Sequence, residues 1–261
     1  MKKTTIAGAI AALALSFAAA PAYAQNAEYD YPEQGDQSGF FNDGKEFGYW
    51  LTLTGTTDYM FRGISQSDQK PAFQADLGAS YGDFYGGFWM STIDFEDTYG
   101  PVEFDTYLGW APVTGAISWD FTAWYYAYQV QDSSLGSGDL NYFEFTGKAS
   151  INPIDKLTLS LFGAFTPEQD IAITDTQTIE GQFEYAMNDW GRFTPTISGL
   201  IGFTNTDIDG YWLGEEDYTY WNAGLNLALD KVNFDFRYWD TDIDNELADS
   251  RFVFSAGIAL P

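Results

Sequence analysis

Phe73-Gln74-Ala75-Asp76-Leu77-Gly78-Ala79-Ser80-Tyr81 alternates strictly between apolar and polar or small residues. Because successive side chains of a β-strand point to opposite faces, this stretch predicts a strand with one apolar and one polar face. Similar stretches recur from Tyr49 to Leu260. The connectors between them are long and short in turn, which is typical of a transmembrane β-barrel with an apolar outer face and a polar lumen.

The sequence predicts an all-β fold, a transmembrane antiparallel barrel of twelve strands. Short turns follow the even-numbered strands and long loops follow the odd ones, so both termini are expected on the periplasmic side. The strands are expected at 48–57, 72–81, 84–93, 102–110, 116–128, 140–151, 156–165, 177–187, 192–203, 217–229, 232–240 and 250–260.

Aromatic residues gather near both ends of these strands, which we interpret as two belts at the two membrane interfaces. A soluble β-sandwich also has short alternating strands, but belts and alternating loop lengths favour the barrel. The belt near the short turns would contain Trp50, Tyr81, Phe84, Trp110 and Trp190, and the belt near the long loops Tyr125, Tyr126, Tyr128, Tyr218, Tyr220, Trp221, Tyr238 and Trp239.

The first residues predict export. Lys2 and Lys3 precede the apolar run 6–20, and Ala22-Tyr23-Ala24 has the small residues of a cleavage site, so residues 1–24 are expected to be a cleaved signal peptide. Residues 25–47 are polar and aperiodic, which predicts a flexible periplasmic segment before a barrel domain at 48–261. The expected location is the bacterial outer membrane, in contact with its lipid and lipopolysaccharide.

Composition excludes several classes of protein. A net charge of −27 disfavours nucleic-acid binding. The chain has no cysteine, which excludes a disulfide scaffold. It has no histidine either, so the usual base of lipases and deacylases and the usual transition-metal ligand are missing. A carboxylate pair could still act as acid and base, but none stands out. We expect no enzyme and, calcium apart, no cofactor.

Several segments in the first half of the chain are similar to one family of outer-membrane proteins. They are residues 58–67 (DYMFRGISQS), 71–74 (PAFQ), 84–95 (FYGGFWMSTIDF), 102–110 (VEFDTYLGW), 125–128 (YYAY) and 141–144 (NYFE). In these segments the chain resembles the TorF family of porins. Gln129 stands where the family has proline, and the chain ends on Ala259-Leu260-Pro261 rather than an aromatic. The resemblance implies an outer-membrane barrel with a pore and names no substrate.

The polar faces of the expected strands supply candidate pore-lining residues. The acids are Asp76, Glu103, Asp105, Asp120, Glu144, Glu180, Glu184 and Asp235, and the bases are Lys148, Arg237 and Arg251. They could form ion pairs that fill a rigid barrel, or an acidic lining that prefers cations. Twelve strands lie between filled barrels of about 8 strands and open porins of about 16–18. We favour a narrow, cation-preferring channel for small solutes; the alternative is a non-conducting structural or surface-interaction barrel. The sequence specifies neither the solute nor the oligomeric state.

Arg62 lies in the first long loop, within the segment most similar to the TorF family. We interpret it as a loop anchor that pairs with Asp58 or Asp94. The alternative is a pore-lining role, in which the guanidinium folds into the mouth and faces Glu103, Asp105 or Glu144. A planar guanidinium suits carboxylate pairing in either position.

The fifth long loop has the spacing of a calcium-binding loop. Asn205, Asp207 and Asp209 take positions 1, 3 and 5, Gly210 takes position 6, and Glu216 takes position 12. No helices are expected on either side, so an acidic surface loop with an Asp-Gly turn is the alternative interpretation. The similar run 240–244 lacks both the glycine and the closing glutamate.

Overall fold

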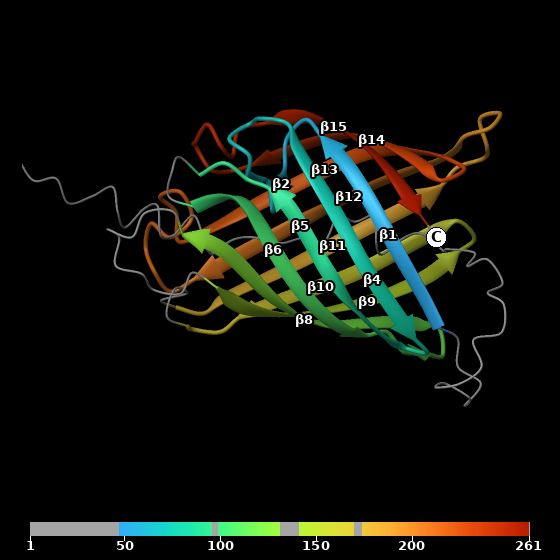
Figure 1. Ribbon diagram of the computed structural model, residues 1–261, viewed down its shortest axis with the longest axis horizontal. Coiled ribbons are helices and arrows are strands. Elements are labelled where there is room, and N and C mark those ends of the chain that lie inside the picture. Colours follow the sequence, from blue (N-terminus) through green and yellow to red (C-terminus); the bar gives the residue numbers. More distant parts are fainter. Residues whose placement is uncertain (1–46, 96–98, 131–140, 170–173, 261) are drawn as a thin grey trace, which may run out of the picture.

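The strands form one antiparallel sheet that closes into a barrel (Figure 1). The computed structural model describes residues 47–95, 99–130, 141–169 and 174–260, so the expected signal peptide and residues 25–46 lie outside the described residues. The twelve long strands are β1 (Phe47–Thr56), β4 (Ala72–Tyr81), β5 (Phe84–Thr92), β6 (Tyr99–Trp110), β8 (Ile117–Val130), β9 (Tyr142–Ile154), β10 (Leu157–Thr166), β11 (Thr176–Ala186), β12 (Thr194–Thr206), β13 (Asp217–Leu229), β14 (Val232–Thr241) and β15 (Arg251–Leu260).

Each long strand pairs with two neighbours. The first strand, β1, pairs with the last, β15, and with β4, while β6 pairs with β8. The short β7 (Val113–Thr114) only extends the edge of β8 in the turn before it. This ladder leaves no free sheet edge, as strands in a bilayer require. The described part of the chain contains no helix that is long and apolar enough to cross a membrane.

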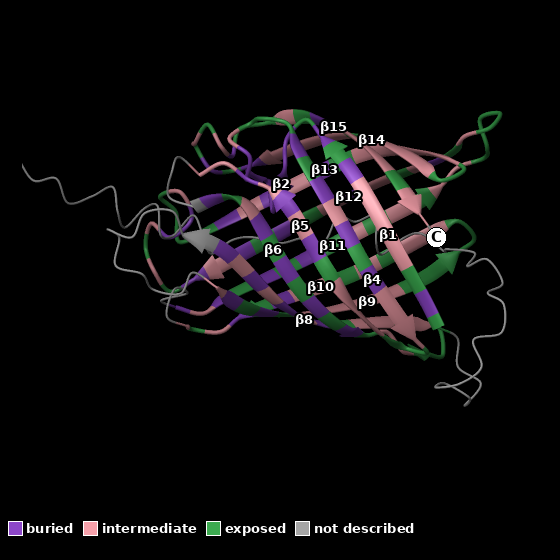
Figure 2. Ribbon diagram, in the orientation of Figure 1, coloured by how far each residue is buried: buried purple, intermediate pink, exposed green. Residues whose placement is uncertain are grey.

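The two faces of each strand differ as predicted. On β4, Phe73 and Leu77 point outward and are exposed, whereas Gln74 and Asp76 are buried inside. Figure 2 shows the same alternation of exposed and buried residues along neighbouring strands. The outward face of the barrel carries large exposed hydrophobic side chains on nearly every strand. A closed barrel with an apolar exterior is the form in which strands cross a bilayer, so the predicted twelve-stranded fold is confirmed.

The expected strand limits differ from the observed ones by three residues at most. Three limits differ by three residues: β12 continues to Thr206 rather than residue 203, β6 begins at Tyr99 rather than residue 102, and β9 continues to Ile154 rather than residue 151. Backbone pairing continues there, with Asn205 opposite Asp217. At the end of β12 the residues 204–206 are polar on both faces, so the alternation of apolar and polar residues stops before the strand does.

The prediction of two aromatic belts is only half right. Phe84 and Trp110 stack on the outer surface near the short turns, as expected. However, Trp50 points inward, where its indole N–H donates to Asp76. Four members of the other expected belt are also buried inside the barrel: Tyr126, Tyr128, Tyr218 and Tyr220. Each of these residues shares the inward face of its strand with polar residues, so its side chain cannot reach lipid.

Trp50 packs across its neighbour strand on Gly78, its direct partner in the register. A Cβ at Gly78 would lie 2.0 Å from Cζ2 of Trp50, so we expect Gly78→Ala to displace the indole and its hydrogen bond to Asp76. Overpacking of this kind costs about 1–3 kcal/mol. Gly181→Ala is the matched control, because a Cβ there meets nothing within 4 Å. Urea unfolding of the barrel in vesicles measures both; equal stabilities would contradict the assignment of Trp50 to the lumen.

Candidate functional site

The first long loop folds into the barrel as a small hairpin. Its strands are β2 (Met60–Phe61) and β3 (Ile64–Ser65), and every residue from Tyr59 to Ser67 is buried. Arg62 and Gly63 form the turn, with φ of 45° and 83°, the combination of a tight two-residue hairpin turn. A Cβ at Gly63 would lie 2.4 Å from Cγ2 of Thr241, so the tip presses against the barrel wall. We call residues 59–67 the inward hairpin.

The base of the inward hairpin is held by Asp58. The carboxylate of Asp58 accepts hydrogen bonds from the hydroxyls of Ser65, at 2.6 Å, and Ser67, at 3.0 Å. It also forms an ion pair with Arg251 on β15, at 2.8 Å. Backbone N–H groups continue the attachment: Gln66 donates to Tyr59, and Ser65 donates to Leu247 of the last long loop. The hairpin is therefore fixed to the last strand and to its own start.

The tip of the inward hairpin is held by a buried ion pair. Nη2 of Arg62 lies 3.0 Å from both carboxylate oxygens of Glu144 on β9, and both side chains are 3% exposed. Thr166 donates a third hydrogen bond to Glu144, and Tyr218 donates to the backbone carbonyl of Arg62. Burial alone would lower the pKa of Arg62, but the charges of Glu144 and its neighbours raise it above its usual value. Arg62 is charged at any physiological pH.

The predicted anchor partners of Arg62 are wrong. Asp58 pairs with Arg251, and Asp94 pairs with Lys70 at 2.7 Å. The turn carries the guanidinium to the far end of the hairpin, away from Asp58 at its base. The alternative interpretation, in which Arg62 folds into the barrel and faces an acid such as Glu144, describes the observed contact.

Aromatic side chains fill the half of the barrel nearer the long loops, which we call the outer half. They come from the barrel wall, from the inward hairpin and from the fifth long loop, whose Tyr211 and Trp212 are 1% exposed. Many rings are in contact, including Tyr107 with Trp124 at 4.7 Å and Tyr126 with Tyr142 at 4.6 Å between centroids. The cluster contains Tyr59, Phe61, Trp89, Tyr107, Trp124, Tyr126, Tyr128, Tyr142, Tyr211, Trp212, Tyr218 and Tyr220.

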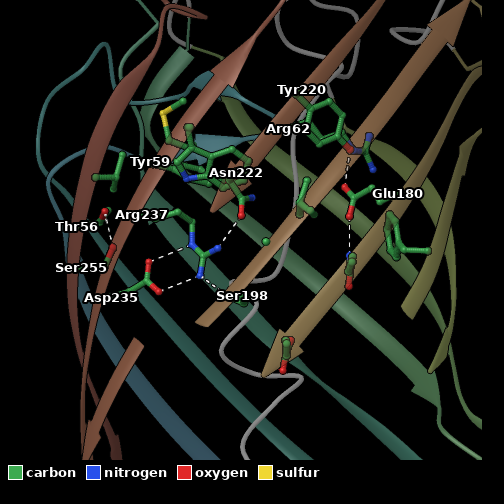
Figure 3. A pocket seen from close by; sticks show the side chains of 18 of the residues that line it. Thr56, Tyr59, Arg62, Glu180, Ser198, Tyr220, Asn222, Asp235, Arg237 and Ser255 are labelled. Carbon is green, nitrogen blue, oxygen red and sulfur yellow. Dashed lines mark hydrogen bonds and ion pairs between the residues drawn. The ribbon is translucent and has the colours of Figure 1, made fainter. Parts of the chain in front are cut away.

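A polar cavity of about 180 Å³ lies in the lumen below the inward hairpin (Figure 3). Arg237 organises one wall: its guanidinium pairs with Asp235 at 3.0 Å and donates to Asn222 at 2.6 Å and Ser198 at 2.9 Å. On the opposite side Glu180 accepts hydrogen bonds from Tyr220 and Gln182. Charged groups of both signs and aromatic rings therefore surround the same space.

The candidate pore-lining residues all lie on inward faces, but they divide into three groups. Arg62, Lys148, Glu180, Glu184, Asp235 and Arg237 line the cavity. On the wall formed by β4 to β8, Asp76 accepts from Trp50 and Tyr107, and Asp120 accepts from Tyr85 and Thr122. Glu103, Asp105, Glu144 and Arg251 lie beside the aromatic cluster or at the base of the hairpin. Their role in lining an open pore stays a prediction.

The lumen position of the aromatic residues and the role of Asp58 differ from what the sequence predicts. A signal for the aromatics was present, because Trp124, Tyr126 and Tyr128 have the same parity along β8 as Asp120 and Thr122. Residues of one parity share one face of a strand. Asp58 carried no comparable signal, because it lies in a loop and its partner Arg251 is 193 residues away.

The loop expected to bind calcium has no preformed metal site. Asn205 lies at the end of β12, and Asp207, Asp209 and Glu216 are exposed. Across the described residues, no three Asp or Glu side chains gather closely enough to hold a metal ion. Calcium binding by this loop stays a prediction, and it would require the three acids to move together.

Comparison with known proteins places the chain in a family. A family model described as "Bacterial protein of unknown function (Gcw_chp)" matches residues 42–258. The chain belongs to this family. No curated protein matches the Gcw_chp chain.

Solved structures show the fold of the Gcw_chp chain in other proteins. The KdgM porin in complex with disordered oligogalacturonate superposes with a TM-score of 0.55 at 7% identity, over 81% of this chain and 99% of that chain. The NanC porin gives a TM-score of 0.52 at 11% identity, over 81% and 99%. At such identities the likeness concerns the barrel alone. The Gcw_chp chain thus shares the barrel fold of these two proteins, with an aromatic outer half and a cavity below it.

Proposed function

We propose that this Gcw_chp chain is an outer-membrane channel of narrow bore for small solutes, restricted at its mouth by the inward hairpin. The observation that carries the proposal is the polar cavity within a closed barrel. The apolar exterior and the fold shared with KdgM and NanC support it. We also propose that residues 1–24 are cleaved as a signal peptide and that residues 25–47 form a periplasmic segment. The resemblance of the first half of the chain to the TorF family of porins supports the same function.

The proposed channel prefers cations. Three inward acids outside the aromatic cluster form no ion pair in the described part of the lumen: Asp76, Asp120 and Glu180. An acidic lining lowers the energy of cations and raises that of anions. KdgM was solved with oligogalacturonate, an anionic sugar chain. We propose that this lumen selects against such anions and passes neutral or cationic solutes of small size.

Liposome swelling tests the proposal. Vesicles that contain the folded barrel are expected to swell in a small neutral sugar faster than protein-free vesicles, and faster than in the corresponding uronic acid at neutral pH. The two solutes differ by one carboxylate, so size contributes little to the difference. Equal swelling in both would refute the charge preference. Swelling no faster than in protein-free vesicles would refute the channel.

The filled outer half favours a second candidate, a non-conducting structural or surface-interaction barrel. The inward hairpin and the aromatic cluster leave Phe61, Tyr126 and Tyr220 with no exposed surface. In this case the acidic long loops would bind cations, other cells or lipopolysaccharide. A variant without the inward hairpin distinguishes the two candidates. If the protein is a channel, the variant should conduct more ions than the wild type. If it is a structural barrel closed by the side chains of its wall, the variant should not conduct.

A further inference from the structure

Two carboxylates of β6 lie buried beside the inward hairpin. Glu103 is 0% exposed and Asp105 is 2% exposed, and both point inward, two residues apart. Their direct partners across the sheet are Tyr128 and Tyr126 on β8. On the other side, Asp105 is paired with Trp89 of β5 in the register. The ring of Trp89 lies 5.4 Å from that of Tyr59 in the hairpin.

The oxygen atoms of this region are largely without partners. One oxygen of Glu103 accepts from the Tyr128 hydroxyl at 2.6 Å. Both oxygens of Asp105 and the hydroxyl of Tyr126 make no hydrogen bond within the described residues. The other oxygen of Glu103 and the Tyr59 hydroxyl lie near each other without forming a hydrogen bond of good geometry. Buried polar atoms in native proteins almost always have a partner, and exceptions point to a water or an ion. Three elements, the hairpin, β6 and β8, direct these oxygens to one region.

The charges of the same region do not balance. When all three are ionised, Glu103, Asp105 and Glu144 carry three negative charges, and Glu144 is near enough to Asp105 to act on it electrostatically. Arg62 supplies one positive charge, through its pair with Glu144. The described ion pairs give Glu103 and Asp105 no basic partner. An excess of two negative charges remains, and burying such charges without compensation is costly.

We propose that Glu103 and Asp105 bind a hard divalent cation, calcium or magnesium, between β6 and the inward hairpin. Both ions take oxygen ligands, and magnesium is often held by one or two carboxylates while it keeps part of its water shell. No three carboxylates converge on one point in the described chain, so the two acids would share the ion with neutral oxygens or water. The site is separate from the exposed loop at 205–216 and does not depend on solute passage.

Thermal unfolding of the folded barrel in detergent tests the site. After removal of metal with a chelator, calcium or magnesium chloride is expected to raise the melting temperature by about 5 °C over sodium chloride at matched ionic strength. Elemental analysis of the dialysed barrel should find about one divalent ion per chain. If the melting temperature does not respond and no ion is retained, the two carboxylates are held as neutral acids and the proposal is overturned.

Variants locate the ion. Asp105→Asn and Glu103→Gln keep the shape of each side chain, and each should abolish the calcium-dependent shift. Asp76→Asn is the control: Asp76 is equally buried but accepts from Trp50 and Tyr107. The triple loop variant Asp207→Asn, Asp209→Asn, Glu216→Gln should also keep the shift. A shift retained in the β6 variants, or lost in the loop variant, overturns the assignment. If the β6 variants do not fold, the ion content of the wild-type barrel decides.

Discussion

Replacing the inward hairpin with a short Gly-Ser link is expected to raise single-channel conductance several-fold. The hairpin occupies the lumen where the wall also contributes buried tyrosines, so its removal opens space in the filled outer half of the barrel. The ends of the excised segment are adjacent, since the N–H of Gln66 donates to the carbonyl of Tyr59 at 2.7 Å. A short link can therefore join Asp58 to Asp68 without moving β1 or β4.

The same link in place of the exposed short turn 188–191 is the control, because that turn lies away from the inward hairpin. It should leave conductance unchanged. Heat-dependent gel mobility verifies that both variants form closed barrels. If the hairpin variant folds but conducts no more than the wild type, the hairpin does not limit the pore.

Glu144→Gln is expected to destabilise the barrel by about 3–5 kcal/mol, because it leaves the Arg62 guanidinium buried without a counter-charge. The isosteric amide keeps the shape of the side chain, so the loss is electrostatic rather than steric. Urea unfolding in vesicles, followed by tryptophan fluorescence, measures the free energy of unfolding. We expect the hairpin to leave the lumen in this variant, so conductance should rise as well.

Arg192→Gln provides the matched control. Arg192 pairs with Asp230 at 3.1 Å, a distance close to that in the buried pair, but both side chains are 78% exposed. Water screens exposed pairs, so this substitution should change the stability little. Equal effects of the two substitutions would show that the Arg62–Glu144 pair is not buried in the membrane-embedded protein.

The barrel could be predicted from the sequence because each strand shows its own alternation of apolar and polar residues. In β4 and β13 the alternation of apolar and polar residues ends where the strand ends, and both sets of limits agree with the prediction. Parity along each strand then assigned the candidate pore-lining residues to the lumen, including Asp76, Lys148 and Arg237. A one-residue error in register would have placed these charges in lipid, which is why the pattern is so informative.

The filling of the lumen could not be predicted in the same way. The inward hairpin has no periodicity, and its only local signal is the Arg62-Gly63 turn. The partner of Arg62 is 82 residues away, so spacing could not identify it. The tyrosines near the long loops have two physically reasonable positions, at the lipid interface or in the lumen. Only their parity with inward polar residues distinguishes the two.

The central claim is that this barrel is a narrow channel with an acidic lumen. Measurement of the reversal potential in a planar bilayer tests this claim most directly. With a salt gradient across the bilayer, the folded wild-type protein is expected to give small unitary currents whose reversal potential lies on the side of cation selectivity. Exchange of Asp235 and Glu180 for Asn and Gln should reduce that selectivity. Anion selectivity, or the absence of any current from both the wild-type barrel and the hairpin-replaced barrel, would contradict the account.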